Sequence, residues 1–217
     1  MYKRQDNRQY FFKENSEGSD YMHSWQFVAA DSIDESTIKE VNIKISGGVE
    51  NNPNHNQTVA LYEYIANDQS NPFTSISGII ENEKNIWMHP PRDKFFNILQ
   101  LNPYPFIQAP FEVGHTWEWS LQIGGIWGDK RWKTWEGIIE NKCIYTITSK
   151  KKTKTAFGEL DCYTIESNAI SELGETKLTA LFNTTYGFME LAYTNIDSST
   201  TRLQLNKLIK AKDQVQQ

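Results

Sequence analysis

The sequence predicts a mainly β protein, with about ten antiparallel strands in a curved sheet and one short helix near residues 92–101. The curved sheet is expected to be a half-barrel or a two-layer arrangement. Two observations predict this class. Short segments alternate apolar and polar residues at the period of a half-buried strand, and brief turns rich in Gly, Asn and Pro separate them. A chain of 217 residues can bury enough apolar surface to fold without disulfides or metals, so we expect no cofactor.

The N-terminal part begins with a polar segment and continues with strands. Residues 1–20 contain few apolar side chains, which predicts a flexible leader, so a single β domain is expected over 21–208. Alternation predicts strands at residues 25–30, 38–46, 58–66, 73–80 and 85–89. Pro90 and Pro91 end the last of these strands, because proline has no N–H to donate to a ladder.

The helix and a proline-rich segment come next. Over 92–101 the apolar residues recur at spacings of three and four, which is typical of a helix. Pro103, Pro105 and Pro110 exclude regular structure from residues 102–111, which are expected to form a stiff, extended crossover. If the domain has two structural halves, 21–101 and 112–208, this crossover joins them.

Residues 115–140 hold five of the seven tryptophans and predict two strands joined by a glycine-rich loop. On the first strand Trp117 and Trp119 share a face with Leu121 and Ile123, so we expect both rings to pack in the core. Trp132 and Trp135 are expected on opposite faces of the second strand, which would place at least one of them in the core. Further strands are predicted at 142–149, 154–167, 176–182, 188–196 and 201–208, and residues 209–217 as a frayed tail.

Two features belong to the hairpin predicted around residues 150–154. Its four lysines are interpreted as a solvated tip rather than an anion site. Cys143 and Cys162 are roughly equidistant from this tip, so they could face each other and form a disulfide in an oxidising compartment. Two buried free thiols are the alternative.

Composition excludes several classes of function. The net charge is −5 and the basic residues are otherwise scattered, which argues against nucleic-acid binding. The four histidines are far apart and there is no C-x-x-C, so no metal site is expected. No apolar run is long enough for a transmembrane helix, and the N-terminus has no secretory h-region. A cytoplasmic protein is therefore expected if Met1 is the true start, and the oligomeric state stays open.

Residues 114–208 resemble the TapB-like domains, a bacterial β-rich family of unknown function. The resemblance rests on three motifs: Gly114-x-x-Trp117, the pattern Thr153-x-Thr155-x-x-Gly158-x-x-x-Cys162-Tyr163-x-Ile165-Glu166, and Tyr186-Gly187-Phe188. It implies an open, curved antiparallel sheet similar to lipoprotein-carrier folds, a place in the cell envelope, and no catalytic residues. The absence of a lipidated N-terminal cysteine departs from an envelope lipoprotein.

Two segments supply candidate contact residues for a ligand or partner. Trp127 lies among glycines beside Asp129 and Arg131, in a loop where nothing in the periodicity requires a buried ring. Packing of this loop against its own sheet is the alternative to ligand contact. His89 and Arg92 are held near each other by the two prolines between them. No serine or cysteine nucleophile is spaced to use His89 as a base, so a histidine that bonds backbone is the simpler interpretation.

These observations favour a non-catalytic binding or carrier protein of the bacterial envelope, which holds an apolar small molecule or a protein partner in a cleft between sheet and helix. The alternative is a carbohydrate-binding module or glycoside hydrolase that uses Trp127, Asp129 and nearby glutamates. Glu118, Glu136 and Glu140 are the glutamates in question, and exposed acids on a sheet face are ordinary solvation. A scaffold tethered to a larger assembly by its leader is a third hypothesis.

Overall fold

The computed structural model describes residues 24–31, 38–48, 57–65 and 73–209. Within these ranges the chain forms a mainly antiparallel β structure with two short 3-10 helices, η2 (Lys94–Leu101) and η3 (Gly125–Trp127). The first six strands are β1 (Ser24–Asp31), β2 (Glu40–Gly48), β3 (Thr58–Ile65), β4 (Phe73–Glu81), β5 (Asn85–Met88) and β6 (Phe106–Gln108). The others are β7 (Thr116–Gly124), β8 (Ile138–Thr155), β9 (Gly158–Ser171), β10 (Gly174–Asn183), β11 (Gly187–Thr194) and β12 (Thr200–Ile209).

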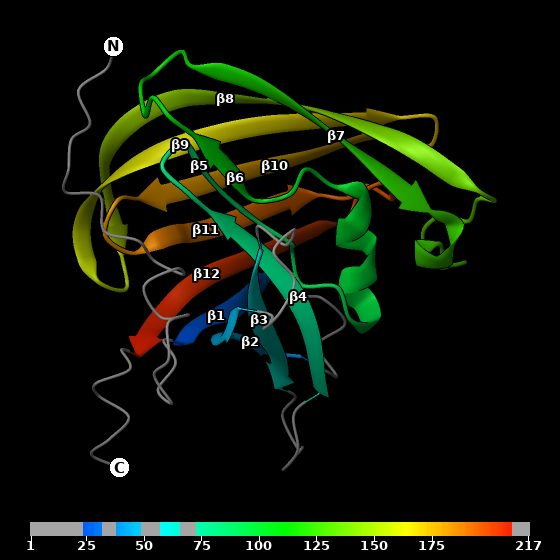
Figure 1. The fold of residues 1–217 in the computed structure, drawn as a ribbon, viewed down its shortest axis with the longest axis horizontal. Helices are drawn as coiled ribbons and strands as arrows, with labels where there is room; N and C mark the ends of the chain where they lie inside the picture. The colour runs from blue at the N-terminus through cyan, green and yellow to red at the C-terminus, as the bar shows by residue number, and fades with distance from the viewer. Residues whose placement is uncertain (1–23, 32–37, 49–56, 66–72, 210–217) are drawn as a thin grey trace.

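All of these strands belong to one 12-stranded sheet in the order β6-β5-β4-β3-β2-β1-β12-β11-β10-β9-β8-β7. Pairing of β1 with β12 joins the first and last parts of the described chain. The sheet curls so that β5 and β6 lie across β9 and β10 (Figure 1). The predicted fold class, a curved antiparallel half-barrel with one short helix near 92–101, is confirmed. The predicted leader 1–20 and the tail after Ile209 lie outside the described residues.

The helix η2 fills the concave side of the sheet. Phe96, Ile98 and Leu99 are all 0% exposed. At the end of η2, Asn141 of β8 and Thr176 of β10 both donate to the Leu101 carbonyl, at 3.0 and 2.7 Å. The next residue, Asn102, donates its side-chain amide to backbone carbonyls of β10 and β11. Because these buried polar groups satisfy each other, η2 is held in one position against the sheet.

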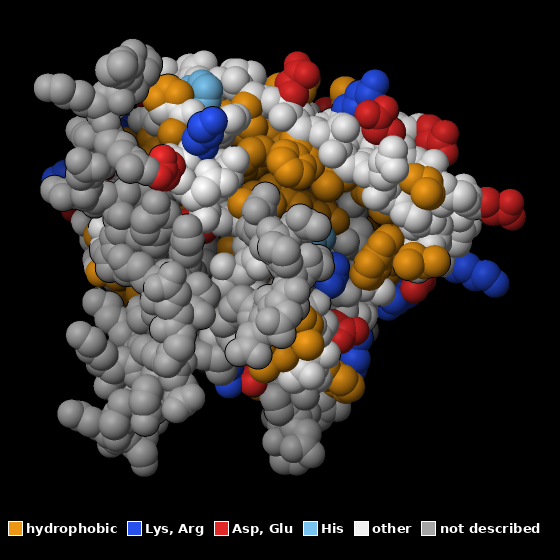
Figure 2. Space-filling model, viewed as in Figure 1, with side chains coloured by type: hydrophobic (Ala, Val, Ile, Leu, Met, Phe, Trp, Pro, Cys, Tyr) orange, Lys and Arg blue, Asp and Glu red, His pale blue; other side chains and the backbone are white. Residues whose placement is uncertain are grey.

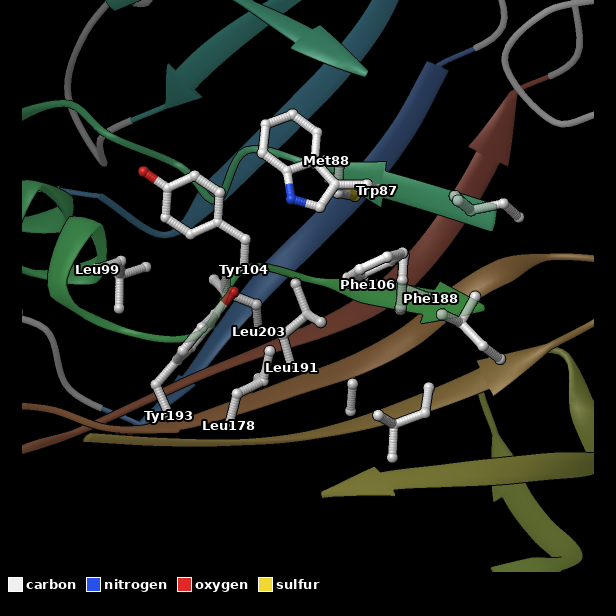
Figure 3. Close-up of a cluster of buried hydrophobic side chains, with 14 of the residues drawn as sticks. Trp87, Met88, Leu99, Tyr104, Phe106, Leu178, Phe188, Leu191, Tyr193 and Leu203 are labelled. Atoms are coloured by element: carbon white, nitrogen blue, oxygen red, sulfur yellow. The ribbon is translucent and has the colours of Figure 1, made fainter. Parts of the chain in front are cut away.

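The core lies between this inner layer and the far wall of the half-barrel. Figure 3 shows Trp87, Tyr104 and Phe106 facing Leu191 and Tyr193 of β11. These five side chains are all at most 4% exposed. At this point the space between sheet and helix is therefore filled by the protein's own side chains.

The prediction of a second strand that contains Trp132 and Trp135 is wrong. Residues 128–137 form a loop, with a single isolated bridge between Asp129 and Lys133, and β8 begins at Ile138. The loop is kept compact by close backbone approach: a Cβ on Gly125 would collide with the carbonyl oxygen of Trp135. Trp132 and Trp135 therefore lie in this loop rather than on opposite faces of a strand.

The crossover at residues 102–111 is also more regular than expected. The three residues Phe106–Gln108 pair with β5 as strand β6. They lie between Pro105 and Pro110, so each of them has an N–H, and a short ladder can form. Proline confines this strand to three residues without excluding it.

The lysine hairpin turns later than expected. Lys150–Lys154 lie inside β8 and pair with β9, and the chain turns at Ala156 and Phe157. Gly158, with a φ of 97°, supplies the left-handed conformation that follows this turn. This displaced turn sets a register in which Cys143 lies opposite Ala169, and Cys162 lies opposite Lys151. Both cysteines are buried free thiols in this structure.

Candidate functional site: an aromatic seam between the end strands

The inward face of β7 is covered at its two ends and open in the middle. Trp117 and Ile123 are 6% and 3% exposed, whereas Trp119 and Leu121 between them are only half-buried. All four residues point into the concave side, because strand residues alternate between faces. The space-filling view shows a patch of apolar side chains below the position of β7 (Figures 1 and 2). On this face of β7, the side chains of Trp119 and Leu121 are therefore the ones most accessible to solvent.

Aromatic rings bridge the two end strands of the sheet at this opening. Trp119 of β7 stacks on Trp87 of β5, with ring centroids 5.5 Å apart. Phe106 of β6 meets Trp117 and Trp119 edge to face, at 5.7 and 5.3 Å. His89 and Tyr104 continue the cluster from Trp87, at 4.7 and 5.6 Å. We call these rings the aromatic seam; its members are Trp87, His89, Tyr104, Phe106, Trp117 and Trp119.

The seam contains hydrogen-bond donors that have no acceptor. Among the residues that the structure describes, the indole N–H groups of Trp87, Trp117 and Trp119 are buried and have no hydrogen-bond partner. An indole N–H can only donate, and leaving a buried polar group unpaired costs about 1–3 kcal/mol. The seam therefore holds three buried donors whose hydrogen-bonding capacity is unused.

His89 joins the seam as a neutral ring. Burial, together with the nearby Arg92 guanidinium, lowers the pKa of His89 from 6.5 to about 4. The backbone carbonyl of His89 accepts a hydrogen bond from the Tyr62 hydroxyl at 2.7 Å. The backbone N–H of Arg92 donates to the Tyr64 hydroxyl oxygen at 2.9 Å. The prolines and these bonds hold His89 against the sheet. A histidine with so low a pKa is uncharged at neutral pH, where it would be a weak general base.

Arg92 links the seam to the tryptophan-rich loop. Its guanidinium donates to the Ile76 carbonyl at 2.7 Å and lies 5.9 Å from the ring centroid of Trp127. The structure thus brings together His89, Arg92 and Trp127, which two separate sequence segments supply. The other two candidates turn toward each other: Arg131 binds Asp129 through two side-chain bonds of 3.0 and 2.9 Å.

The acidic residues do not form a catalytic pair around the seam. Hydrogen bonds from Arg131 lower the pKa of the Asp129 carboxyl, which keeps it ionised. Glu118 is exposed on the outward face of β7, and Glu140 lies 3.5 Å from Lys142 on the surface of β8. Within the described ranges, no group of three His, Cys, Asp or Glu side chains could hold a metal ion. None of the helices described there is long and apolar enough to cross a membrane.

Sequence reasoning missed most of the seam. No sequence pattern marks Trp87, Tyr104 or Phe106 as members of a site, and the predicted core packing of Trp119 holds in part, because its half-buried ring packs against the core. Alternation along β7 correctly predicts that Trp119 points inward. It cannot predict that β7 is an end strand, with a ladder to β8 on one edge and none to another described strand on its other edge. The proline-flanked Phe106, which lies in the predicted crossover, was the available signal.

Comparison with known proteins supports the fold. No family model matches the chain, and neither does any curated protein. A solved candidate lipoprotein of Parabacteroides distasonis is similar at a TM-score of 0.50 and 11% identity, covering 88% of this chain and 96% of that chain. A candidate exported protein with YmcC-like fold from Bacteroides fragilis has a TM-score of 0.44 and 11% identity, covering 87% and 95%.

The hypothetical lipoprotein YmcC of Escherichia coli has a TM-score of 0.41 and 8% identity, covering 88% of this chain and 87% of that chain. At these identities the likeness concerns the fold alone. None of these comparisons shows the TapB-like family. The curved β architecture is thus one that also occurs in the solved Parabacteroides distasonis protein.

Proposed function

We propose that this chain is a non-catalytic binding protein of the bacterial envelope, which holds an apolar molecule with acceptor oxygens at the aromatic seam. One observation carries the proposal: on the inward face of β7, Trp119 and Leu121 are only half-buried, while Trp117 and Ile123 at its two ends are buried. Inward-facing apolar residues are normally covered, so an opening between two end strands is where a ligand can enter.

The chemistry of the seam defines the ligand class. The half-buried Trp119 ring provides apolar contact at the surface of the seam. The indole N–H groups of Trp87 and Trp119 are buried and unpaired, and they can donate to ester, amide or hydroxyl oxygens of a ligand that enters between the rings. A pure hydrocarbon would leave these donors unsatisfied, and a charged molecule would lose its hydration beside the rings. An apolar body with a few neutral acceptor groups fits best.

The envelope placement draws on the fold. The Parabacteroides distasonis protein of similar fold is a candidate lipoprotein. The resemblance of residues 114–208 to the TapB-like domains also implies a place in the cell envelope. The carbohydrate alternative has less support from the geometry, because Arg92 lies over the Trp127 ring and Arg131 occupies the Asp129 carboxylate. A glycan remains a distinguishable outcome of the experiment below.

The test is native mass spectrometry of the full chain, purified from the envelope fraction of its own host. We expect an apolar molecule bound to the parent protein, and occupancy reduced at least about tenfold in Trp119→Ala, because one ring contact contributes roughly 1.5 kcal/mol or more. Trp119→Phe keeps a ring and removes the donor, so its occupancy should be intermediate.

Ile144→Ala is the matched control, since Ile144 is 48% exposed on the outer face of β8. It should bind as the parent does. A thermal unfolding curve for each variant separates lost binding from lost folding. A bound glycan would favour the alternative function, a bound polypeptide would favour a protein partner, and a bare chain in every preparation would contradict the proposal.

A further inference from the structure

The loop between β7 and β8, residues 125–137, is a structured projection. Gly125 N–H donates to the Gly137 carbonyl at 2.8 Å, and Asp129 N–H donates to the Lys133 carbonyl at 2.9 Å, so the two arms of the loop are tied together. Gly128 lies so close to the opposite arm that a Cβ there would be 3.2 Å from the Lys133 oxygen. We call residues 125–137 the projecting loop.

Its tryptophans anchor this loop to the body of the protein. Trp132 is 8% exposed and meets Phe95 of η2 edge to face at 6.1 Å. Trp135 donates its indole N–H to the Ile123 carbonyl of β7 at 3.3 Å. The apolar side chains that stay exposed on the loop are therefore held in place by a folded base.

Two isoleucines are exposed side by side at this end of the molecule. Ile126 is 89% exposed and Ile138 is 70% exposed. The Ile126 side chain lies over Gly124, 3.9 Å from where a Cβ would be, and Gly124 is directly opposite Ile138 in the ladder. Single exposed apolar residues are common. Adjacent exposed apolar residues on a tip that also carries a half-buried tryptophan indicate a surface that contacts a partner.

The projecting loop has a small excess of positive charge, with three cations and two acids, although the whole chain carries a net charge of −5. Lys130, Arg131 and Lys133 are all exposed on the projecting loop. Of the acids on the loop, Asp129 is bound by Arg131 and Glu136 is exposed. Figure 2 shows apolar side chains beside Lys and Arg, with Asp and Glu side chains among them, at the end of the molecule where β7 terminates in Figure 1.

We propose that the projecting loop docks this protein on an anionic lipid surface. Ile126 and Ile138 would enter the boundary between head groups and acyl chains, while Lys130 and Lys133 extend to lipid phosphates. A basic residue near an anionic bilayer contributes about 1 kcal/mol, and tryptophan is favoured at this depth. A narrow convex tip suits a deformable lipid surface better than a protein, which needs roughly 800 Å² of matched area.

Co-sedimentation of the full chain with vesicles tests this proposal. Vesicles of phosphatidylcholine with about one quarter phosphatidylglycerol should bind the protein, and pure phosphatidylcholine should bind it less. Ile126→Ser should weaken binding at least about fivefold, because the isoleucine can no longer bury its side chain in lipid. Ile126 is almost fully exposed in the folded protein, so the variant should fold normally.

Two further measurements make the outcome decisive. Lys130→Gln with Lys133→Gln should weaken binding to the anionic vesicles alone, and added salt should do the same, because it screens exposed charges. Ile170→Ser is the matched control, since Ile170 is 59% exposed on the outer face of β9. Equal binding of Ile126→Ser and parent, or no difference between neutral and anionic vesicles, would overturn the proposal.

Discussion

His89 should make the stability of this protein depend on pH. Its pKa is about 4 in the folded protein and 6.5 when unperturbed, because burial and Arg92 disfavour the charged ring. Between pH 6.5 and 4 the unfolded chain therefore binds a proton that the folded chain does not bind. The free energy of unfolding should fall as the pH drops through this window, by about 1 kcal/mol at pH 5.5 and at most about 3 kcal/mol near pH 4.

Urea unfolding of the parent and of His89→Gln at several pH values measures this effect. Glutamine does not titrate, so the variant should lose the part of the pH dependence that His89 causes. The backbone carbonyl that accepts the Tyr62 hydrogen bond is unchanged by this substitution. If the parent and variant curves stay parallel between pH 7 and 4, His89 is not held neutral by its surroundings.

At the scale of the element, β7 has one bonded edge and one edge with no ladder among the described residues. Two backbone hydrogen bonds mark the ends of the β7–β8 ladder: Gly125 N–H donates to the Gly137 carbonyl, and Ile147 N–H donates to the His115 carbonyl. With the register, they determine which residues of β7 direct their N–H and C=O groups toward β8. By alternation, Trp119 and Leu121 use their N–H groups in the ladder, and the Ser120 N–H points to the edge without a ladder. The seam therefore lies beside the edge of β7 that makes no ladder with another described strand.

Proline substitution tests this assignment directly. Ser120→Pro removes an N–H that makes no ladder bond, whereas Leu121→Pro breaks a bond and leaves a carbonyl of β8 without its donor. At each position the loss of unfolding free energy is taken as the difference between the proline and the alanine variant. This difference should be about 2–3 kcal/mol larger at Leu121 than at Ser120. Chemical denaturation of the four variants measures it. Equal losses would show that another segment pairs with β7.

Most elements of the fold could be predicted from local pattern, and the candidate site could not. Alternation predicted the strand at 38–46, and in the observed β2 the alternate residues Val41, Ile43 and Ile45 are at most 2% exposed. Spacing predicted a helix over 92–101, where η2 lies. These are properties of one segment and its own period. Where two segments approach each other, local pattern failed, as it did for the loop at Gly125 and Gly128.

The seam illustrates the same limit. Trp87 and Trp119 come from strands at opposite ends of the sheet order, so their stacking depends on how far the whole sheet curls. Twist and curvature accumulate over all the strands and are not encoded in any one of them. The hairpin register failed for a related reason: the turn position depends on Gly158, and the charge pattern of the lysines does not indicate it.

At the scale of the whole molecule, the half-barrel is brought together by side chains where no ladder joins its described end strands. Phe106 of β6 contacts Trp117 and Trp119 of β7, and it also meets Tyr145 of β8 at 5.4 Å. It is 3% exposed, and β6 has only three residues with which to hold its place. The curl of the sheet therefore depends strongly on this one ring.

Phe106→Ala should consequently lower the free energy of unfolding by about 3–5 kcal/mol, as expected for a buried ring that leaves a cavity.

Phe157→Ala is the control. Phe157 is half-buried at the β8–β9 turn, where its ring stacks on Tyr186 at 4.5 Å. Its loss should cost about 1 kcal/mol. Urea denaturation gives both values, and near-ultraviolet circular dichroism follows the order of the tryptophans. Because Phe106 touches both seam tryptophans of β7, its variant should also lose the tryptophan signal of the seam, and Phe157→Ala should keep it. Similar losses of stability in the two variants would mean that the end strands are held together by contacts other than the aromatic seam.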